Sequence, residues 1–530
     1  MTETSRATGT SSTTWAKELD ELTRRLQFSA AMGGEAGVAK QHERGKWTVR
    51  ERLDELVDPG SFREFGALAG TGTYDSEGRF VSFLPKPSVD GYAEIEGRTV
   101  VVTGGDFTVR GGSARSGQGG LGQEPFPNER ALQVSVPFIR LLDASGGSVR
   151  TFEELGRTYL PDGNVTSQVD AQLLERVPVV SAVMGSVAGL PAINACMAHW
   201  SVMVRGTSHL FPGGPPVVKA ALGVDISKDE LGGSDIHVGV SGAIDNLAEN
   251  EADALWQIRR FLSYLPSSVD ELAPIEPAYD PVGSSDELRT LVPKDRRIPF
   301  DVRRLIELVI DEGSLFEIAP IYGPSRITAL ARIDGYPVGL MANNPMAFGG
   351  STDLAAGEKA MRLLQLCDQF HLPVIDFADE PGFMVGPDVE RLGIERAGAR
   401  LITTVCRTRM PMLTMVVGRL FGVGGQSHHR PSGMFRRFAW PSAVWGSMHI
   451  AGGAAAAYRR DIEQSDDPVR MKAEIEARLE AISSPFRTAE ATAQDIIDPA
   501  ATRTVLVDFV RDAQRVLLQQ LGAPVHSYRP

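Results

Sequence analysis

Few residues of this chain have the types and spacing that side-chain catalysis requires. The adjacent histidines His428 and His429 are candidate metal ligands, but neighbouring side chains in an extended loop point in opposite directions, and no carboxylate follows at a metal-binding spacing. The sequence has neither the His-Glu-x-x-His pattern of zinc hydrolases nor the Gly-x-Ser-x-Gly turn of serine hydrolases. The cysteines, Cys196, Cys367 and Cys406, lie far apart, which excludes a four-cysteine zinc site. No metal is predicted in this chain.

Glycine-rich turns offer a different kind of chemistry. Short apolar runs such as Val100–Thr103, Phe138–Leu142 and Val179–Met184 end in such turns, where backbone N–H groups face outward. Two N–H groups aimed at one oxygen stabilise an enolate or oxyanion, and each donor lowers the barrier by about 2.7–4 kcal/mol. The sequence therefore favours a site that polarises a carbonyl group, although glycines that only pack the turns are an equal alternative.

The elements that would carry these turns occur twice. When the chain is shifted by 238 positions, residues 93–113 lie on residues 331–351 without a gap, and seven of 21 positions are identical. Strand-like runs alternate with helix-like segments in both halves. The repeat predicts a duplicated α/β domain. Two further matches follow at slightly smaller offsets: Val136–Asp143 with Leu372–Asp379, and Val177–Gly185 with Met410–Gly418.

Composition and proline distribution indicate the organisation of the chain. Its 530 residues have a net charge of −13, whereas nucleic-acid-binding proteins are typically basic. The charge therefore argues against a general nucleic-acid-binding function. Residues 1–14 are predicted to be a disordered tail, and Trp15–Leu26 and Val49–Leu56 are predicted helices. Six prolines between Pro266 and Pro299 indicate a linker, and the predicted domains are 15–272 and 273–530. We expect a cytoplasmic protein without a membrane span, because neither a secretory signal nor about 18 consecutive apolar residues occur.

A series of ordered motifs runs through nearly the whole chain. In the first half these are Lys40-Gln-His-Glu-Arg-Gly-Lys46, Thr48-Val-Arg-Glu-Arg-Leu53, Asp58-Pro-Gly-Ser-Phe62, Asp106-Phe-Thr-Val109, Gly111-Gly-Ser113, Gly213-Gly-Pro-Pro-Val-Val-Lys219 and Glu230-Leu-Gly-Gly233. In the second half they are Asn343-Asn-Pro345, Pro381-Gly-Phe383, Phe421-Gly422 and Trp440-Pro441. Together the motifs resemble the carboxyltransferase (β) subunits of biotin-dependent acyl-CoA carboxylases, the family that acts on propionyl-, methylcrotonyl- and geranyl-CoA.

The resemblance implies a crotonase-like fold in both halves. It also implies a homohexamer with active sites at the subunit interface, where the first half of one chain binds the acyl-CoA and the second half of another binds carboxybiotin. A biotin carboxylase and biotin-carrier (α) subunit would be the partner, and biotin the cofactor. In this family the cofactor supplies the base and the protein supplies oxyanion holes, which would account for the lack of an evident catalytic side chain.

Site residues can be carried over motif by motif. The resemblance implies one oxyanion hole in the stretch Val187-Ala-Gly189-Leu190-Pro191, where we expect Gly189 and Leu190 to donate, and a second at Val423 and Gly424. The first hole departs from the family pattern, because Pro191 stands where a relative has an N–H donor and proline has none. The residues implied in acyl-CoA binding are Ser145, Gly146, Gly147, Ser148, Gly213, Gly214 and Lys219.

Three interpretations of Pro191 remain open. The loop is shifted so that Gly189 and Leu190 donate and the chain is a working carboxyltransferase; or the same fold carries out altered chemistry, such as decarboxylation or transcarboxylation; or the chain is a non-catalytic assembly subunit of a mixed carboxylase complex. The polar loop Gln426-Ser-His-His-Arg430 further predicts an acyl group with a polar or charged end.

Overall fold

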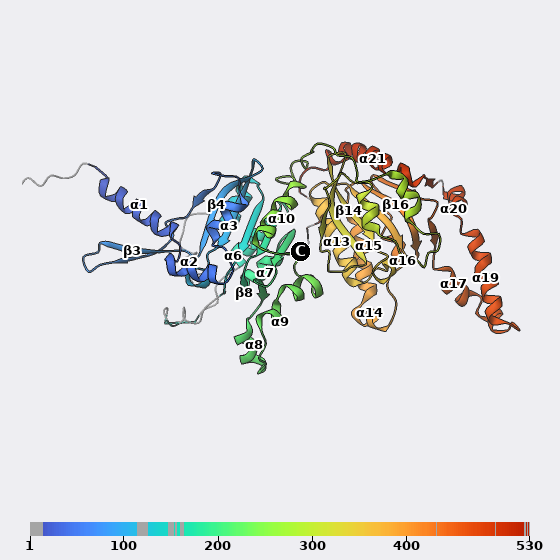
Figure 1. The fold of residues 1–530 in the computed structure, drawn as a ribbon, viewed down its shortest axis with the longest axis horizontal. Helices are drawn as coiled ribbons and strands as arrows, with labels where there is room; N and C mark the ends of the chain where they lie inside the picture. Colours follow the sequence, from blue (N-terminus) through green and yellow to red (C-terminus); the bar gives the residue numbers. More distant parts are fainter. Residues whose placement is uncertain are drawn as a thin grey trace, which may run out of the picture.

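The computed structural model describes residues 14–113, 126–146, 153, 156–158, 164–430, 432–492, 494–523, 526, 528 and 530. The predicted tail therefore lies outside the described residues, except for Thr14. Figure 1 shows two sheet-and-helix bodies side by side, with the C-terminus returning between them.

A seven-stranded sheet organises the first half. Its first two pairings are antiparallel and the remaining ones are parallel, and the middle strands are apolar almost throughout because helices or loops cover both faces. In spatial order the strands are β1 (Arg63–Phe65), β4 (Ser88–Ile95), β5 (Arg98–Gly105), β6 (Phe138–Leu142), β7 (Val179–Val183), β9 (Trp200–Val204) and β11 (Asn246–Ala248).

The second half repeats this sheet, again with two antiparallel pairings followed by parallel ones. One additional strand, β18 (Val444–Gly446), pairs with the end of β16. In spatial order the others are β12 (Phe316–Ile318), β13 (Arg326–Ile333), β14 (Tyr336–Asn343), β15 (Val374–Glu380), β16 (Met412–Phe421), β17 (Phe435–Ala439) and β19 (Asp495–Ile496).

The two sheets have equivalent strands at the sequence positions that the repeat predicted. The offset of 238 positions places β4 on β13 and β5 on β14 from end to end. Backbone conformations also recur, since Glu96 (φ 51°) corresponds to Asp334 (φ 55°) and Gly111 (φ 63°) to Gly349 (φ 62°). Residues such as Glu96 seldom adopt a positive φ, so their recurrence at equivalent turns confirms the duplicated α/β fold.

Helices of the first half include both predicted ones. The helix α3 (Val49–Leu56) has the expected bounds and starts with a capping box between Thr48 and Glu51. The leading helix α1 (Ala16–Ala30) extends four residues beyond its predicted end. The others are α2 (Gly34–Glu43), α4 (Pro127–Val134), α6 (Asn164–Leu173), α7 (Leu190–Cys196), α8 (Pro215–Leu222), α9 (Lys228–Gly232) and α10 (Glu251–Ser263), and the short strands are β2 (Gly70–Tyr74), β3 (Phe80–Pro85), β8 (Ser186–Ala188) and β10 (His209–Phe211).

Helices of the second half cover its sheet and extend beyond it at one end (Figure 1). They are α12 (Val302–Glu307), α13 (Leu354–Gln369), α14 (Pro387–Leu392), α15 (Ile394–Arg407), α16 (Gly422–Gln426), α17 (Ile450–Ala457), α18 (Arg459–Glu463), α19 (Pro468–Ile482), α20 (Pro485–Thr492) and α21 (Thr502–Leu517).

The proline-rich segment between α10 and α12 connects the two halves. It contains only η3 (Ser285–Glu287) and the single turn α11 (Leu288–Leu291). The halves also pack directly, because one hydrophobic core contains Trp200 and Phe261 of the first half and Phe316 of the second. The boundary between 272 and 273 stays a prediction. None of the helices in the described part of the chain is sufficiently long and apolar to span a bilayer.

Candidate functional site

Two equivalent strand-to-helix turns occupy the positions of the predicted oxyanion holes. The match of Gly185 with Gly418 places Gly189 on Gly422, and both glycines have a positive φ (73° and 60°). This conformation lets β8 turn into α7 and β16 turn into α16 within one residue. We call residues 189–191 the first loop and residues 422–424 the second loop.

The first loop presents one free donor. The Gly189 N–H donates to the Phe211 carbonyl oxygen at 3.3 Å. Pro191, the second residue of α7, has no N–H. The Leu190 N–H has no acceptor among the described residues, and the Leu190 side chain is exposed. The first loop can therefore offer Leu190 directly, and Gly189 only if its bond to Phe211 breaks.

The second loop presents two donors. Val423 and Gly424 follow Gly422 at the start of α16, and neither of their N–H groups has an acceptor within the described ranges. A Cβ on Gly424 would lie 2.9 Å from the Gly382 Cα, so only glycine fits there. In the repeat, Val423 corresponds to Leu190 and Gly424 to Pro191. Comparison of the two loops thus shows that the first loop lacks the N–H that Gly424 provides in the second loop.

Predicted acyl-CoA-binding residues lie at varying distances from the first loop. Ser145 and Gly146 are adjacent to it, because the Ala188 N–H donates to the Ala144 carbonyl at 3.2 Å and a Cβ on Gly146 would lie 2.7 Å from the Ala188 oxygen. Gly147 and Ser148 lie outside the described residues. The remaining three follow Phe211 along the chain: Gly213, Gly214 and Lys219.

Helix α8, which contains Lys219, lies at the lower edge of the first half in Figure 1. Gly214 is its N-cap residue, and Lys219 forms a solvent-exposed ion pair with Asp225 at 2.7 Å. The structure therefore brings Ser145 and Gly146 next to the first loop, and the role of Lys219 in acyl-CoA binding stays a prediction.

A buried charge cluster supports the loop that contains Ser145 and Gly146. The Asp143 carboxylate, at the end of β6, accepts Lys46 Nζ at 2.6 Å and Arg52 Nη1 at 3.1 Å. Arg52 also binds Glu251 through Nε and Nη2, both at 2.8 Å. Burial lowers the pKa of Lys46, although the Asp143 charge opposes the shift. Sequence reasoning missed this cluster, whose members are up to about 200 residues apart.

A second polar chain fixes β8 beside the first loop. Ser186 Oγ lies 3.1 Å from His209 Nδ1 and 3.0 Å from Lys228 Nζ, and His209 Nε2 lies 3.1 Å from Asp229 Oδ1. Burial lowers the pKa of His209, and its hydrogen bond with Asp229 opposes this. Ser186 and His209 are paired residues of β8 and β10, so these contacts hold the strand that leads into Gly189.

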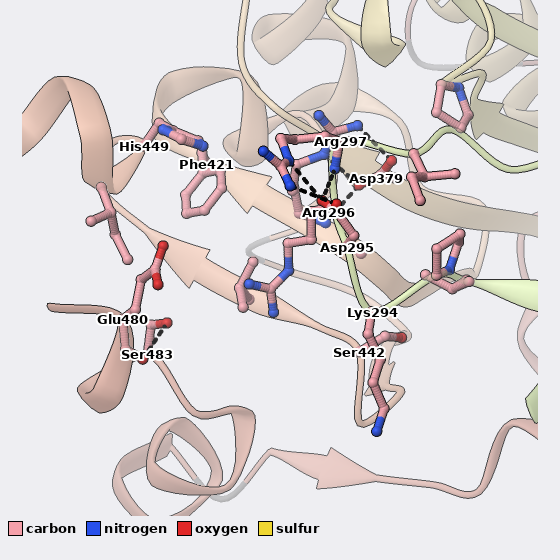
Figure 2. A pocket seen from close by; sticks show the side chains of 18 of the residues that line it. Lys294, Asp295, Arg296, Arg297, Asp379, Phe421, Ser442, His449, Glu480 and Ser483 are labelled. Carbon is pink, nitrogen blue, oxygen red and sulfur yellow. Dashed lines mark hydrogen bonds and ion pairs between the residues drawn. The ribbon is translucent and has the colours of Figure 1, made fainter. Parts of the chain in front are cut away.

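A cavity of about 1150 Å³ adjoins the strand that leads into the second loop. Figure 2 shows Phe421 and His449 on one side of it and Glu480 and Ser483 on another. Arg419 lines it as well and holds Asp379 at 2.7 Å. Residues of the predicted linker also form part of the cavity wall, which was not predicted from the sequence. The signal in the sequence that could have indicated this was the charged run Lys294, Asp295, Arg296 and Arg297.

None of the residues 426–430 lines this cavity, and the polar acyl group predicted from them stays a prediction. Ser427, His428 and Arg430 are almost completely buried. His428 binds Asp376 and Glu380 rather than a metal, and no group of three or more His, Cys, Asp or Glu side chains in the described residues is arranged to hold a metal ion. Gln426 and His429 of the same segment are exposed.

Known proteins share this architecture over nearly its full length. The chain is 34% identical to the propionyl-CoA carboxylase carboxyltransferase subunit of Haloferax mediterranei, over 94% of this chain and 96% of the relative. It is 34% identical to the methylmalonyl-CoA carboxyltransferase 12S subunit of Propionibacterium freudenreichii (92% of each chain), and 31% identical to the methylmalonyl-CoA decarboxylase subunit alpha of Veillonella parvula (93% and 95%).

Solved structures agree with these relatives. Transcarboxylase 12S, described as a hexamer and solved with methylmalonyl-coenzyme A bound, superposes with a TM-score of 0.84 at 30% identity and covers 99% of both chains. A single-chain long-chain acyl-CoA carboxylase superposes with a TM-score of 0.76 at 28% identity, over 93% of this chain and 50% of that one. The carboxyl transferase domain itself matches residues 40–518. With its duplicated crotonase-like fold, this chain belongs to the carboxyl transferase family.

Proposed function

We propose that this chain is the carboxyltransferase subunit of a biotin-dependent acyl-CoA carboxylase. The pair of equivalent loops carries the proposal, since each ends a strand with a left-handed glycine and starts a helix with outward N–H groups. Such groups stabilise negative charge on an oxygen without a titrating side chain. In this proposal Leu190 polarises the acyl-CoA thioester, and Val423 and Gly424 polarise the ureido carbonyl of the biotin side.

The separation of the loops supports an active site between two chains. Figure 1 shows α7 in the first half and α16 in the second, with α10 and α13 between them. One transferred carboxyl group has to pass between the two holes, so the first loop of one chain would face the second loop of another. The hexamer described for transcarboxylase 12S is an assembly of the required kind. We propose a homohexamer for this chain.

We propose the cavity beside the second loop as the site of the biotin group. Its volume of about 1150 Å³ exceeds that of most small-molecule pockets, and its wall combines the Phe421 ring with the charged Arg419 and Asp379. Bound there, biotin on a partner carrier subunit would supply the carboxyl group and the base. The chain's own part is to orient the ring against Phe421 and to place the Val423 and Gly424 N–H groups.

The cytoplasmic location stays a prediction.

One observation favours a second candidate function. Pro191 leaves the first loop with fewer donors than the second, and a decarboxylase subunit and a transcarboxylase subunit are among the relatives. A chain that releases CO2 from a malonyl-type thioester, or passes the carboxyl group to another acceptor, would use the same two loops.

Fixation of labelled bicarbonate distinguishes these functions. The complex purified with its biotinylated partner is supplied with ATP and, one at a time, with several acyl-CoAs. Acid-stable label that depends on one acyl-CoA is the expected result and identifies the substrate. If the biotin becomes carboxylated but no acyl-CoA is labelled, the carboxylase proposal fails; CO2 release from a malonyl-type thioester would then identify the decarboxylase.

Replacing Pro191 with alanine tests the first loop. The variant places an N–H where the second loop has Gly424, so kcat/KM for a simple acyl-CoA is expected to rise, by up to about 10²-fold if the added donor is fully aligned. Ile193→Ala, an exposed position on the same helix, serves as the matched control and should leave the rate near that of the parent. An unchanged or lower rate in Pro191→Ala would favour a loop in which Gly189 and Leu190 donate.

A further inference from the structure

A buried network of charged residues lies beneath the second loop. His428 Nδ1 is 2.7 Å from Asp376 Oδ2, and His428 Nε2 is 3.3 Å from Glu380 Oε2. Arg326 Nη2 binds the same Glu380 oxygen at 2.9 Å. Arg326, Asp376, Glu380 and His428 are almost entirely inaccessible to solvent, and we call them the His428 network. Their charges balance only when His428 is protonated.

The His428 network contacts the second loop on one side and continues from the end of α16 on the other. The backbone N–H of His428 donates to the Gly425 carbonyl at 3.3 Å, so the histidine directly follows the last turn of α16. On the other side, Glu380 Oε1 accepts the Gly382 N–H at 2.9 Å. Gly382 packs directly against Gly424, since a Cβ on Gly424 would lie 2.9 Å from its Cα. The position of the Gly424 N–H therefore depends on the network.

The first half has no counterpart of this network. At the equivalent positions it carries Ser88, Ala144 and Ala195, together with Arg140, which pairs with Asp170 at 2.7 Å. The first half instead buries a different set of charges beside the first loop, namely Lys46, Arg52, Asp143 and Glu251. That set contains no histidine, and Ala195 stands at the position equivalent to His428, so the buried histidine between two carboxylates is specific to the second loop.

We propose that protonated His428 is a positioning residue that keeps the Val423 and Gly424 N–H groups aligned for carboxyl transfer. The inference rests on the proposed function of the second loop. With both ring nitrogens protonated, His428 donates to Asp376 and to Glu380 and holds the end of α16 against β15. Without the second proton, a lone pair on Nε2 faces the Glu380 carboxylate, and the two groups repel each other.

The charges around His428 determine the direction of its pH dependence. The charged groups facing it are Asp376 and Glu380 of β15 and Arg326 of β13. Burial alone would lower the pKa of His428, but the Asp376 carboxylate and the bond to Glu380 raise it above its ordinary value of 6.5. Burial opposes ionisation of Glu380, yet His428 and Arg326 lower its pKa to about 2. Alignment should thus persist at neutral pH and be lost as the pH rises through the pKa of folded His428.

The pH profile of carboxyl transfer by the purified complex tests this inference. Wild-type kcat is expected to fall at alkaline pH in a one-proton step, and His428→Gln should abolish that step and lower kcat at neutral pH by at least about tenfold. The KM for acyl-CoA should change less than about twofold, because acyl-CoA binds the other half. His429→Gln is the matched control from the same loop, since His429 packs on Phe435 outside the network.

A second variant covers the case in which His428→Gln fails to fold. Glu380→Gln keeps the shape of the side chain but removes one charge that raises the pKa of His428, so the alkaline step should move to lower pH. The inference is overturned if His428→Gln retains the alkaline step, if its defect lies only in KM, or if the step is unmoved in Glu380→Gln.

Thermal unfolding separates this inference from the proposed function. If the wild-type complex transfers no carboxyl group at any pH, the proposed function fails, but the protonation of His428 remains measurable. A group whose pKa is raised by folding stabilises the protein below its unfolded pKa and loses that contribution as the pH rises through its folded pKa. The Tm of the wild type should therefore exceed that of His428→Gln at low pH, and this difference should shrink as the pH rises above 6.5 and through the raised pKa of folded His428. A constant difference overturns the inference.

Discussion

Replacing Val423 with proline is expected to lower kcat for carboxyl transfer by about 10²–10³-fold, because it removes one oxyanion donor. The position tolerates proline structurally. Val423 follows Gly422 in the first turn of α16, its side chain is exposed, and proline is tolerated in the first turn of a helix because the N–H groups there make no bond within the helix. Rates are measured at saturating acyl-CoA with the partner subunit present.

Val423→Ala is the matched control, because it removes the same side-chain contacts and keeps the N–H. Its kcat should stay within about threefold of the parent. If the proline and alanine variants lose activity equally, the side chain rather than the N–H matters at this position, and the second loop is not an oxyanion hole.

Replacing Arg52 with methionine is expected to lower the free energy of unfolding by about 3–5 kcal/mol, because it leaves a buried carboxylate unpaired. Arg52 is fully buried on α3, and its guanidinium binds Glu251 twice and Asp143 once. Burial by itself would lower the pKa of Arg52, but the Glu251 hydrogen bonds and the Asp143 charge raise it. The change is followed by denaturant unfolding with a probe in the first half.

Two further variants show whether the loss of stability in Arg52→Met comes from the unpaired buried charge. The double variant Arg52→Met with Glu251→Met removes the stranded charge and should be more stable than the single variant. Arg289→Met breaks an exposed pair with Asp498 at 2.6 Å and should change stability little. If Arg52→Met is no more destabilising than Arg289→Met, the buried cluster does not hold α3, α10 and β6 together.

Much of the fold could be predicted because the two halves of the chain can be aligned with each other. The glycine and apolar positions shared by residues 93–113 and 331–351 mark two antiparallel strands and the turns around them, and the structure has β4, β5, β13 and β14 at those positions. The bounds of α3 were also predictable, since Thr48 and Glu51 form a local capping box.

The site was predictable only where it depends on backbone. The loops at Gly189 and Gly422 follow from local sequence, because a left-handed turn between strand and helix requires glycine. The His428 network and the Arg52 cluster were not predictable, since their partners come together only through the tertiary fold. The burial of His428 was not predictable for the same reason, because polarity in sequence does not reveal which buried group will pair with a histidine.

The left-handed glycine at the start of each loop has an evolutionary consequence. Gly189 and Gly422 preserve the same turn in both copies, although the next two residues have diverged to Leu190-Pro191 and Val423-Gly424. Because the turn depends on the glycine alone, the residues after it could drift independently once the ancestral gene had doubled. Each copy was then free to specialise on one of two reactants without reinventing its scaffold.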